Sequence, residues 1–240
     1  SRMETEIAKF SGFLGREFGG EVDLWATQNE PMAIPLSGYL IASQTRTNPP
    51  NLAYRFREAR EIMAALQVAH ARMYDAVKAN DTVSADMDGA PASIGIVYNL
   101  APVFPRDPQK PTDQAAAEDG DYLYNKAFLD AVIKGDFDPD LDGIPEHRAD
   151  MAGRMDWLGI NYYTRITMEA TSDGNASFPD LSIRTAFNPL TLQQGEDYAK
   201  GIYDVVKMGQ AYGLPMYITE NGAADNLDDG RGPRFLVQHL

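Results

Sequence analysis

The chain of 240 residues contains no cysteine and only three histidines. The absence of cysteine excludes disulfide bonds, thiolate metal sites and a cysteine nucleophile, and the scattered histidines do not have the spacing of a zinc site. We therefore expect neither a metal nor a cofactor. Basic residues are also scarce, with 21 Lys and Arg against 35 Asp and Glu. This balance disfavours nucleic acid as a partner, because phosphates demand a positive surface.

Long apolar runs are missing as well. No stretch approaches the roughly 20 apolar residues of a membrane span, and no basic, apolar leader is visible. These absences predict a cytoplasmic protein with no membrane partner, although the start at Ser1 rather than methionine predicts a truncated N-terminus. The composition, 44% hydrophobic and 10% aromatic, is ample for a packed core, and we expect residues 1–240 to form one structural unit.

Two kinds of hydrophobic spacing alternate along the chain. Apolar residues at intervals of three and four predict helices, and short continuous apolar runs predict buried strands. The predicted helices lie within residues 3–18, 52–80, 113–133 and 198–209, and the predicted strands at 22–28, 94–98, 156–160 and 215–219. Buried strands that alternate with helices predict an α/β fold with a parallel sheet, of the (β/α)8 TIM-barrel type. Because a closed barrel has eight strands, four βα units make a partial barrel.

Two of the predicted strands end in a glutamate next to an asparagine, in the segments Asn29-Glu30-Pro31 and Glu220-Asn221-Gly222. Pro31 biases Glu30 away from helix, and Gly222 permits a tight exit from the strand. Both carboxyls are therefore expected at the carboxyl ends of strands, where barrel enzymes bind their ligands. Glycosidic bond cleavage needs such a pair, because one carboxyl delivers a proton while the other stays ionised to attack or stabilise the sugar.

These segments resemble glycoside hydrolase family 1, the retaining β-glucosidases and β-galactosidases. The similar segments are Trp25–Pro31, Ala69–Ala71, Ile94–Asn99, Asp156–Thr164 and Pro215–Gly222. The resemblance implies that Glu30 is the general acid/base and Glu220 the nucleophile. It implies a double displacement through a covalent glycosyl-enzyme, with β-D-glucosides or β-D-galactosides as substrates.

The resemblance also implies roles for four further residues at the strand ends. Tyr163 would donate a hydrogen bond that orients Glu220, and Asn29 would bind the sugar 2-hydroxyl. Asn161 would support the substrate site nearby. Asn99 would line the leaving-group side, although a plain turn residue at a strand end is an equally good interpretation.

The predicted strands resemble the fourth to the seventh of the family's barrel, so several sugar-binding positions of the family lie outside this chain. The resemblance therefore implies a central portion truncated at both ends. Because catalysis depends on a preorganised pocket, we expect the chain alone to be weak or inactive unless self-association or a complementary barrel half completes it. Two alternatives remain: another clan of retaining (β/α)8 glycosidases, and a non-catalytic half-barrel that binds sugar or self-associates through uncovered strand edges.

Two other features invite a metal interpretation. The segment Asp138–Gly143 matches the first half of an EF-hand loop, but the twelfth position is Ala149, where a bidentate glutamate is needed. An aspartate-rich turn is the expected structure, with calcium binding as the alternative. His70 lies among apolar residues on a predicted helix, and we expect a core histidine with satisfied hydrogen bonds rather than a ligand.

Overall fold

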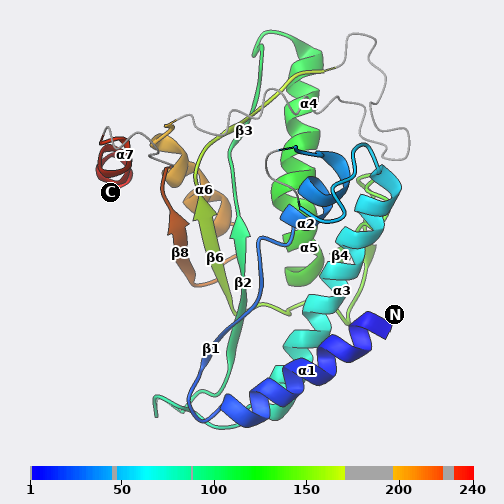
Figure 1. The fold of residues 1–240 in the computed structure, drawn as a ribbon, viewed down its shortest axis with the longest axis vertical. Coiled ribbons are helices and arrows are strands. Elements are labelled where there is room, and N and C mark those ends of the chain that lie inside the picture. The colour runs from blue at the N-terminus through cyan, green and yellow to red at the C-terminus, as the bar shows by residue number, and fades with distance from the viewer. Residues whose placement is uncertain (1, 45–47, 88, 171–196, 224–229) are drawn as a thin grey trace.

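A computed structural model describes residues 2–44, 48–87, 89–170, 197–223 and 230–240. At its centre lies a four-stranded sheet, in which every neighbouring pair is parallel. The strands, in spatial order, are β1 (Leu24–Asn29), β2 (Ser93–Asn99), β6 (Trp157–Tyr162) and β8 (Met216–Asn221). Figure 1 shows them beside one another. The predicted parallel sheet of four strands is confirmed.

A helix precedes each strand, as the hydrophobic spacing predicts. Helix α1 (Arg2–Phe18) leads to β1, α3 (Phe56–Asn80) to β2, and α6 (Lys200–Gln210) to β8. The helical stretch before β6 is continuous but has three parts, which are α4 (Pro111–Asp121), the π-helical turn η2 (Tyr122–Lys126) and α5 (Ala127–Ile133). Helix α7 (Arg231–His239) ends the chain.

Shorter elements that the sequence patterns did not predict join these units. Helix α2 (Ala33–Pro35) and the π-helical turn η1 (Leu36–Leu40) follow β1. Strands β3 (Val103–Pro105) and β7 (Ile166–Met168) form a small parallel pair, and β4 (Asp136–Phe137) pairs with β5 (Glu146–His147) in antiparallel fashion. No helix in the described ranges is both long and apolar enough to cross a membrane.

The main core lies between the two inner strands and the helices. Every residue of β6 is buried, and alternate residues of β2 and β6 pack in one cluster with α3 and α5. Members of this cluster are Ile96, Tyr98, Leu158, Ile160, Tyr162, Met63 and Phe128. Because side chains alternate along a strand, the intervening residues of β2 and β6 face the opposite side of the sheet. Asn99 and Asn161 belong to that opposite side.

The two outer strands are less buried than the sequence predicts. Leu24 on β1 is 49% exposed, and Tyr217 and Ile218 on β8 are 47% and 45% exposed. The expectation of buried strands at 22–28 and 215–219 is therefore wrong for these side chains. Each outer strand has a hydrogen-bonded neighbour on one side only within the described sheet. The apolar residues of these two outer strands are therefore partly exposed to solvent.

Helix α1 packs through its smallest residues instead of its apolar stripe. Ser11, Gly12 and Gly15 are the buried positions, and a Cβ on Gly15 would lie 3.3 Å from the backbone carbonyl oxygen of Val77 on α3. Glycine at this position therefore permits the close approach of the two helices. The stripe that predicts the helix is largely exposed at Met3 (47%), Phe10 (55%) and Phe18 (46%).

His70 is a core histidine, as predicted. Its side chain is fully buried, Nδ1 lies 2.7 Å from the Thr27 hydroxyl, and Nε2 contacts the carbonyl oxygen of Arg154. Since a carbonyl only accepts, Nε2 carries the proton, and Nδ1 accepts from Thr27. Burial lowers the pKa of His70 to about 4, so the imidazole is neutral at pH 7.

Candidate active site

Strand β1 carries an extra residue just before Glu30. Ala26 lies opposite Gly95 but Asn29 lies opposite Val97, so β1 uses one more residue than β2 over this interval. This irregularity is a β-bulge, a device that re-aims side chains at the ends of strands. Glu30 then donates its backbone N–H to the carbonyl of Val97 at 2.8 Å. Its φ of 47° lies in the left-handed region, which costs a non-glycine residue about 1 kcal/mol.

The Glu30 carboxylate is held by two side-chain amides from the neighbouring strands. Nδ2 of Asn99, at the end of β2, donates to Oε1 at 3.1 Å, and Nδ2 of Asn161, on β6, donates to the same oxygen at 2.9 Å. Nδ2 of Asn161 also donates to Oδ1 of Asn29 at 3.2 Å. Glu30 is half-buried and Asn161 is fully buried. Both of these hydrogen bonds go to one oxygen of the carboxylate, Oε1, and fix its position.

Strand β8 has a corresponding bulge before Glu220. Ile218 lies opposite Ile160, whereas Glu220 lies opposite the next residue of β6, Asn161. Thr219 is therefore the additional residue of β8. Without a bulge, adjacent side chains would point to opposite faces of the sheet. With it, both Thr219 and Glu220 lie on the face that carries the amide groups.

Tyr163, which directly follows β6, contacts the carboxylate of Glu220. Its hydroxyl donates a hydrogen bond to Oε2 of Glu220. Burial, this hydrogen bond and the negative charges of Glu220 and Glu30 raise the pKa of Tyr163. The phenol therefore stays protonated at neutral pH and acts as a donor. The hydrogen bond to Glu220 is the direct contact that this hydroxyl makes in the site.

The structure gathers all six predicted residues at one end of the sheet, in two hydrogen-bonded groups. One group contains Glu30 with Asn29, Asn99 and Asn161, and the other contains Glu220 with Tyr163. Asn29 and Glu220 are exposed. The site thus presents one carboxylate bound by neutral amides and one bound by a phenol, and their different surroundings suit them to different roles.

One residue of the site was not predicted. The Thr219 hydroxyl donates to Oδ1 of Asn161 at 2.7 Å, and so connects the strand that carries Glu220 with the group around Glu30. Its position directly before Glu220 in the sequence could have indicated that it belongs to the site. Ordinary strand alternation, however, assigns it to the opposite face.

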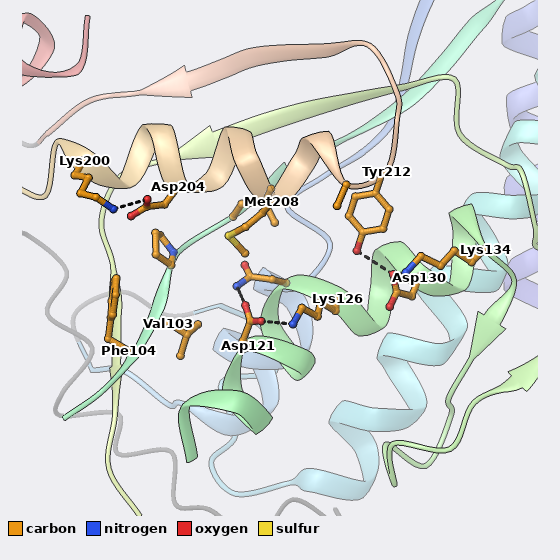
Figure 2. Close-up of a pocket in the computed structure, with 14 residues that line it drawn as sticks. Val103, Phe104, Asp121, Lys126, Asp130, Lys134, Lys200, Asp204, Met208 and Tyr212 are labelled. Atoms are coloured by element: carbon orange, nitrogen blue, oxygen red, sulfur yellow. Dashed lines mark hydrogen bonds and ion pairs between the residues drawn. The ribbon is translucent and has the colours of Figure 1, made fainter. Parts of the chain in front are cut away.

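A cavity in the described part of the chain lies away from these residues. It has a volume of about 480 Å³ and lies between α6 on one side and η2 and α5 on the other (Figure 2). None of the six predicted site residues is among the residues that line it. The lysine–aspartate pairs along it are Lys126–Asp121, Lys134–Asp130 and Lys200–Asp204. Because these charges compensate one another, we interpret the cavity as a seam between helices in which the charged groups are paired.

The segment Asp138–Gly143 forms a turn organised by its first residue. Carboxylate oxygens of Asp138, Asp140 and Asp142 lie within 4.8 Å of one another, so the predicted cluster exists. Asp138 is buried, however, and both of its oxygens accept hydrogen bonds. The donors are the Tyr122 hydroxyl at 2.6 Å and the backbone N–H groups of Asp142 at 3.2 Å and Gly143 at 2.9 Å. These contacts account for the geometry of an aspartate-rich turn.

We expect that titration with calcium to millimolar concentration produces no binding heat, because the hydrogen bonds of Asp138 compete with metal coordination and the bidentate twelfth ligand is absent. Isothermal calorimetry of the chain checks this, with Asp140→Asn as the matched variant. A saturable heat that disappears in Asp140→Asn contradicts the prediction.

Comparison with known proteins connects this geometry to a family. The model of Glycosyl hydrolase family 1 matches residues 5–232. A β-galactosidase of Pyrococcus woesei is 33% identical over 259 residues, covering 100% of this chain and 49% of that protein. A β-galactosidase of Sulfolobus acidocaldarius is 34% identical over 249 residues, covering 100% and 47%. The chain spans about half the length of the curated relatives it matches.

The solved structures agree with the sequence comparison. The hyperthermophilic β-glucosidase from Pyrococcus furiosus superposes with a TM-score of 0.70 at 26% identity, covering 100% of this chain and 45% of that one. The described parallel sheet is not closed and is part of a (β/α)8 barrel, which confirms the predicted fold class. Since the family model and these relatives align along nearly its entire length, the chain belongs to glycosyl hydrolase family 1.

Proposed function

We propose that this chain supplies the catalytic carboxylates of a retaining β-glycosidase, with Glu30 as general acid/base and Glu220 as nucleophile. The observation that supports it most is the pair of carboxylates at the carboxyl ends of β1 and β8, each with its own hydrogen-bond donors. The proposed substrates are β-D-glucosides and β-D-galactosides, because similar proteins are named β-glucosidase and β-galactosidase.

The proposed reaction has two displacements. In the first, a Glu220 oxygen attacks the anomeric carbon, the bond to the leaving oxygen breaks, and Glu30 gives that oxygen its proton. In the second, Glu30 takes a proton from water as the water oxygen attacks the same carbon and the bond to Glu220 breaks. The anomeric configuration inverts twice and is therefore retained.

The other residues of the site have roles that follow from their contacts. Tyr163 orients Glu220 and stabilises its ionised form by hydrogen bonding. Asn29 is exposed, and its Nδ2 makes no hydrogen bond within the described part of the chain, so it is available to a sugar hydroxyl. Asn161 is fully buried and already bonded through both ends of its amide, which favours a positioning role over direct sugar contact. Asn99 holds Glu30 next to the leaving-group side.

The outer strands favour association with further protein. Both β1 and β8 have one neighbour in the described sheet, and apolar side chains such as Leu24 and Ile218 are exposed there. Uncovered edges of this kind invite strand pairing. We propose that a second copy or a complementary barrel half covers them. A non-catalytic fragment that self-associates or binds sugar is the alternative function, and sedimentation of the chain tests for assembly.

We expect the chain alone to hydrolyse an aryl β-glucoside weakly or not at all, because Glu220 is exposed to water and catalysis needs a dry, preorganised pocket. A chimera in which this chain replaces the matching segment of the Pyrococcus woesei β-galactosidase is expected to be clearly active. Chromogenic assays of both proteins check this. Equal rates for chain and chimera refute the expectation, and an inactive but folded chimera favours the non-catalytic alternative.

A further inference from the structure

Thr219 occupies an unusual position relative to the reactive groups. As the additional residue of the β8 bulge, it lies beside Glu220 but points its hydroxyl at Asn161 on the neighbouring strand. The distance of 2.7 Å from Oγ1 to Oδ1 is that of a good hydrogen bond. Because Oδ1 of an amide only accepts, Thr219 is the donor. The hydroxyl therefore fixes which end of the Asn161 amide faces β8.

The opposite end of the same amide faces Glu30. Nδ2 of Asn161 donates to Oε1 of Glu30 at 2.9 Å and to Oδ1 of Asn29 at 3.2 Å. Rotation of the amide by half a turn would place Oδ1 against these two oxygens, which would repel it. Asn161 is fully buried, so water cannot replace a lost partner. The orientation of this one amide consequently determines the environment of the Glu30 carboxyl.

We propose that Thr219 is a positioning residue, which holds the Asn161 amide so that it and Asn99 donate to Oε1 of Glu30 and the proton of the general acid resides on Oε2. Two N–H donors on one oxygen leave no place for a proton there, because each donor needs a lone pair. The statement about the acid proton rests on the proposed function. The coupling of Thr219 to Glu30 through Asn161 rests on the hydrogen bonds alone.

Gly159 makes the position of Thr219 possible. It precedes Asn161 by two residues on β6 and so lies on the same face of the sheet. A Cβ on Gly159 would lie 3.0 Å from Cγ2 and 3.1 Å from Oγ1 of Thr219, tighter than ordinary contact. Gly159→Ala should therefore displace the hydroxyl without removing it. This variant, on β6, therefore also perturbs the hydrogen bond from Thr219 on β8 to Asn161.

The test measures the titration of Glu30 directly in the intact chain, by carbon-13 NMR of its labelled carboxyl group, assigned by the loss of the signal in Glu30→Gln. Thr219→Val removes the donor but keeps the shape, and Thr219 is exposed, so no core packing is lost. The amide then loses its anchor, donation to the charged carboxylate weakens, and the midpoint rises by about 0.5 to 1 pH unit. Thr219→Ser, which keeps the hydroxyl, restores the wild-type midpoint.

The other titratable groups around Glu30 are unchanged in these variants. Within the described residues they are Tyr124 on η2 and Tyr163 after β6, with Glu220 on β8 hydrogen-bonded to Tyr163. An unchanged midpoint in Thr219→Val, or an equal rise in Thr219→Ser, overturns the inference. Gly159→Ala is expected to follow Thr219→Val in direction. If hydrolysis does not depend on Glu30 or Glu220 while the midpoint still moves in Thr219→Val, the proposed function fails and the coupling stands.

Discussion

Glu220→Gln is expected to lower kcat/KM for an aryl β-glycoside by at least about a thousandfold, whatever the leaving group, because the amide cannot form the covalent bond to the anomeric carbon. Gln has the shape of Glu and can still contact the Tyr163 hydroxyl. The loss should therefore appear without a loss of folding. Steady-state rates in the active chimera, with circular dichroism as a check on folding, measure it.

If Glu30 is the general acid/base, the rate loss in Glu30→Gln should depend on the leaving group. A leaving group such as 2,4-dinitrophenolate needs no proton, so the first displacement should be nearly normal, whereas an alkyl glycoside should lose about a hundredfold or more. Glu146→Gln, on the exposed strand β5, serves as the control and should change neither rate. A Glu30→Gln variant that is insensitive to the leaving group would assign the proton transfer to another residue. Activity that survives in Glu220→Gln would remove the nucleophile assignment.

The free energy of unfolding is expected to fall by up to about 3 kcal/mol as the pH drops from about 6.5 to about 4, because of His70. Burial holds the pKa of His70 near 4 in the folded chain, whereas an unfolded histidine has a pKa near its usual 6.5. Between these values the unfolded state binds more protons than the folded state. Stability is therefore fully present above pH 6.5 and is lost as the pH falls through this window.

Urea denaturation between pH 4.5 and 7.5 measures this effect in the wild type and in His70→Gln. The variant should be less stable at pH 7 but show a flatter dependence on pH. The Arg148 hydrogen bond lowers the pKa of Asp150, so that carboxylate loses its contribution mainly below pH 4 and falls outside the window. An unaltered slope in His70→Gln would refute the assignment.

Most of the architecture could be predicted from hydrophobic spacing. The continuous apolar run that became β6 is buried along its whole length, and the three- and four-residue spacing of Phe56, Ala59 and Met63 marks the packed face of α3. The same reasoning fails for α1. Its packed face consists of Ser11 and glycines, and no scale of hydrophobicity distinguishes such a face from an ordinary polar one.

The site could be predicted as a set of residues but not as a geometry. The glutamates, Tyr163 and the three asparagines stand at strand ends, where the sequence places them. Pro31 correctly biases Glu30 away from right-handed helix, but nothing in the sequence specifies the φ of 47°. Thr219 was missed because a bulge changes the face of a single residue, and the pairing of strands determines a bulge.

Each of the two bulges separates its outer strand into two parts, one before the bulge and one after it. On the N-terminal side of the bulges, β1 and β8 pair in regular register with β2 and β6. Substitutions there are expected to change the stability of the sheet. On the C-terminal side of the bulges, a few local contacts set the backbone direction. Substitutions there are expected to change the surroundings of the Glu30 and Glu220 carboxylates. Substitutions on the two sides of a bulge should therefore change sheet stability and the surroundings of the carboxylates separately.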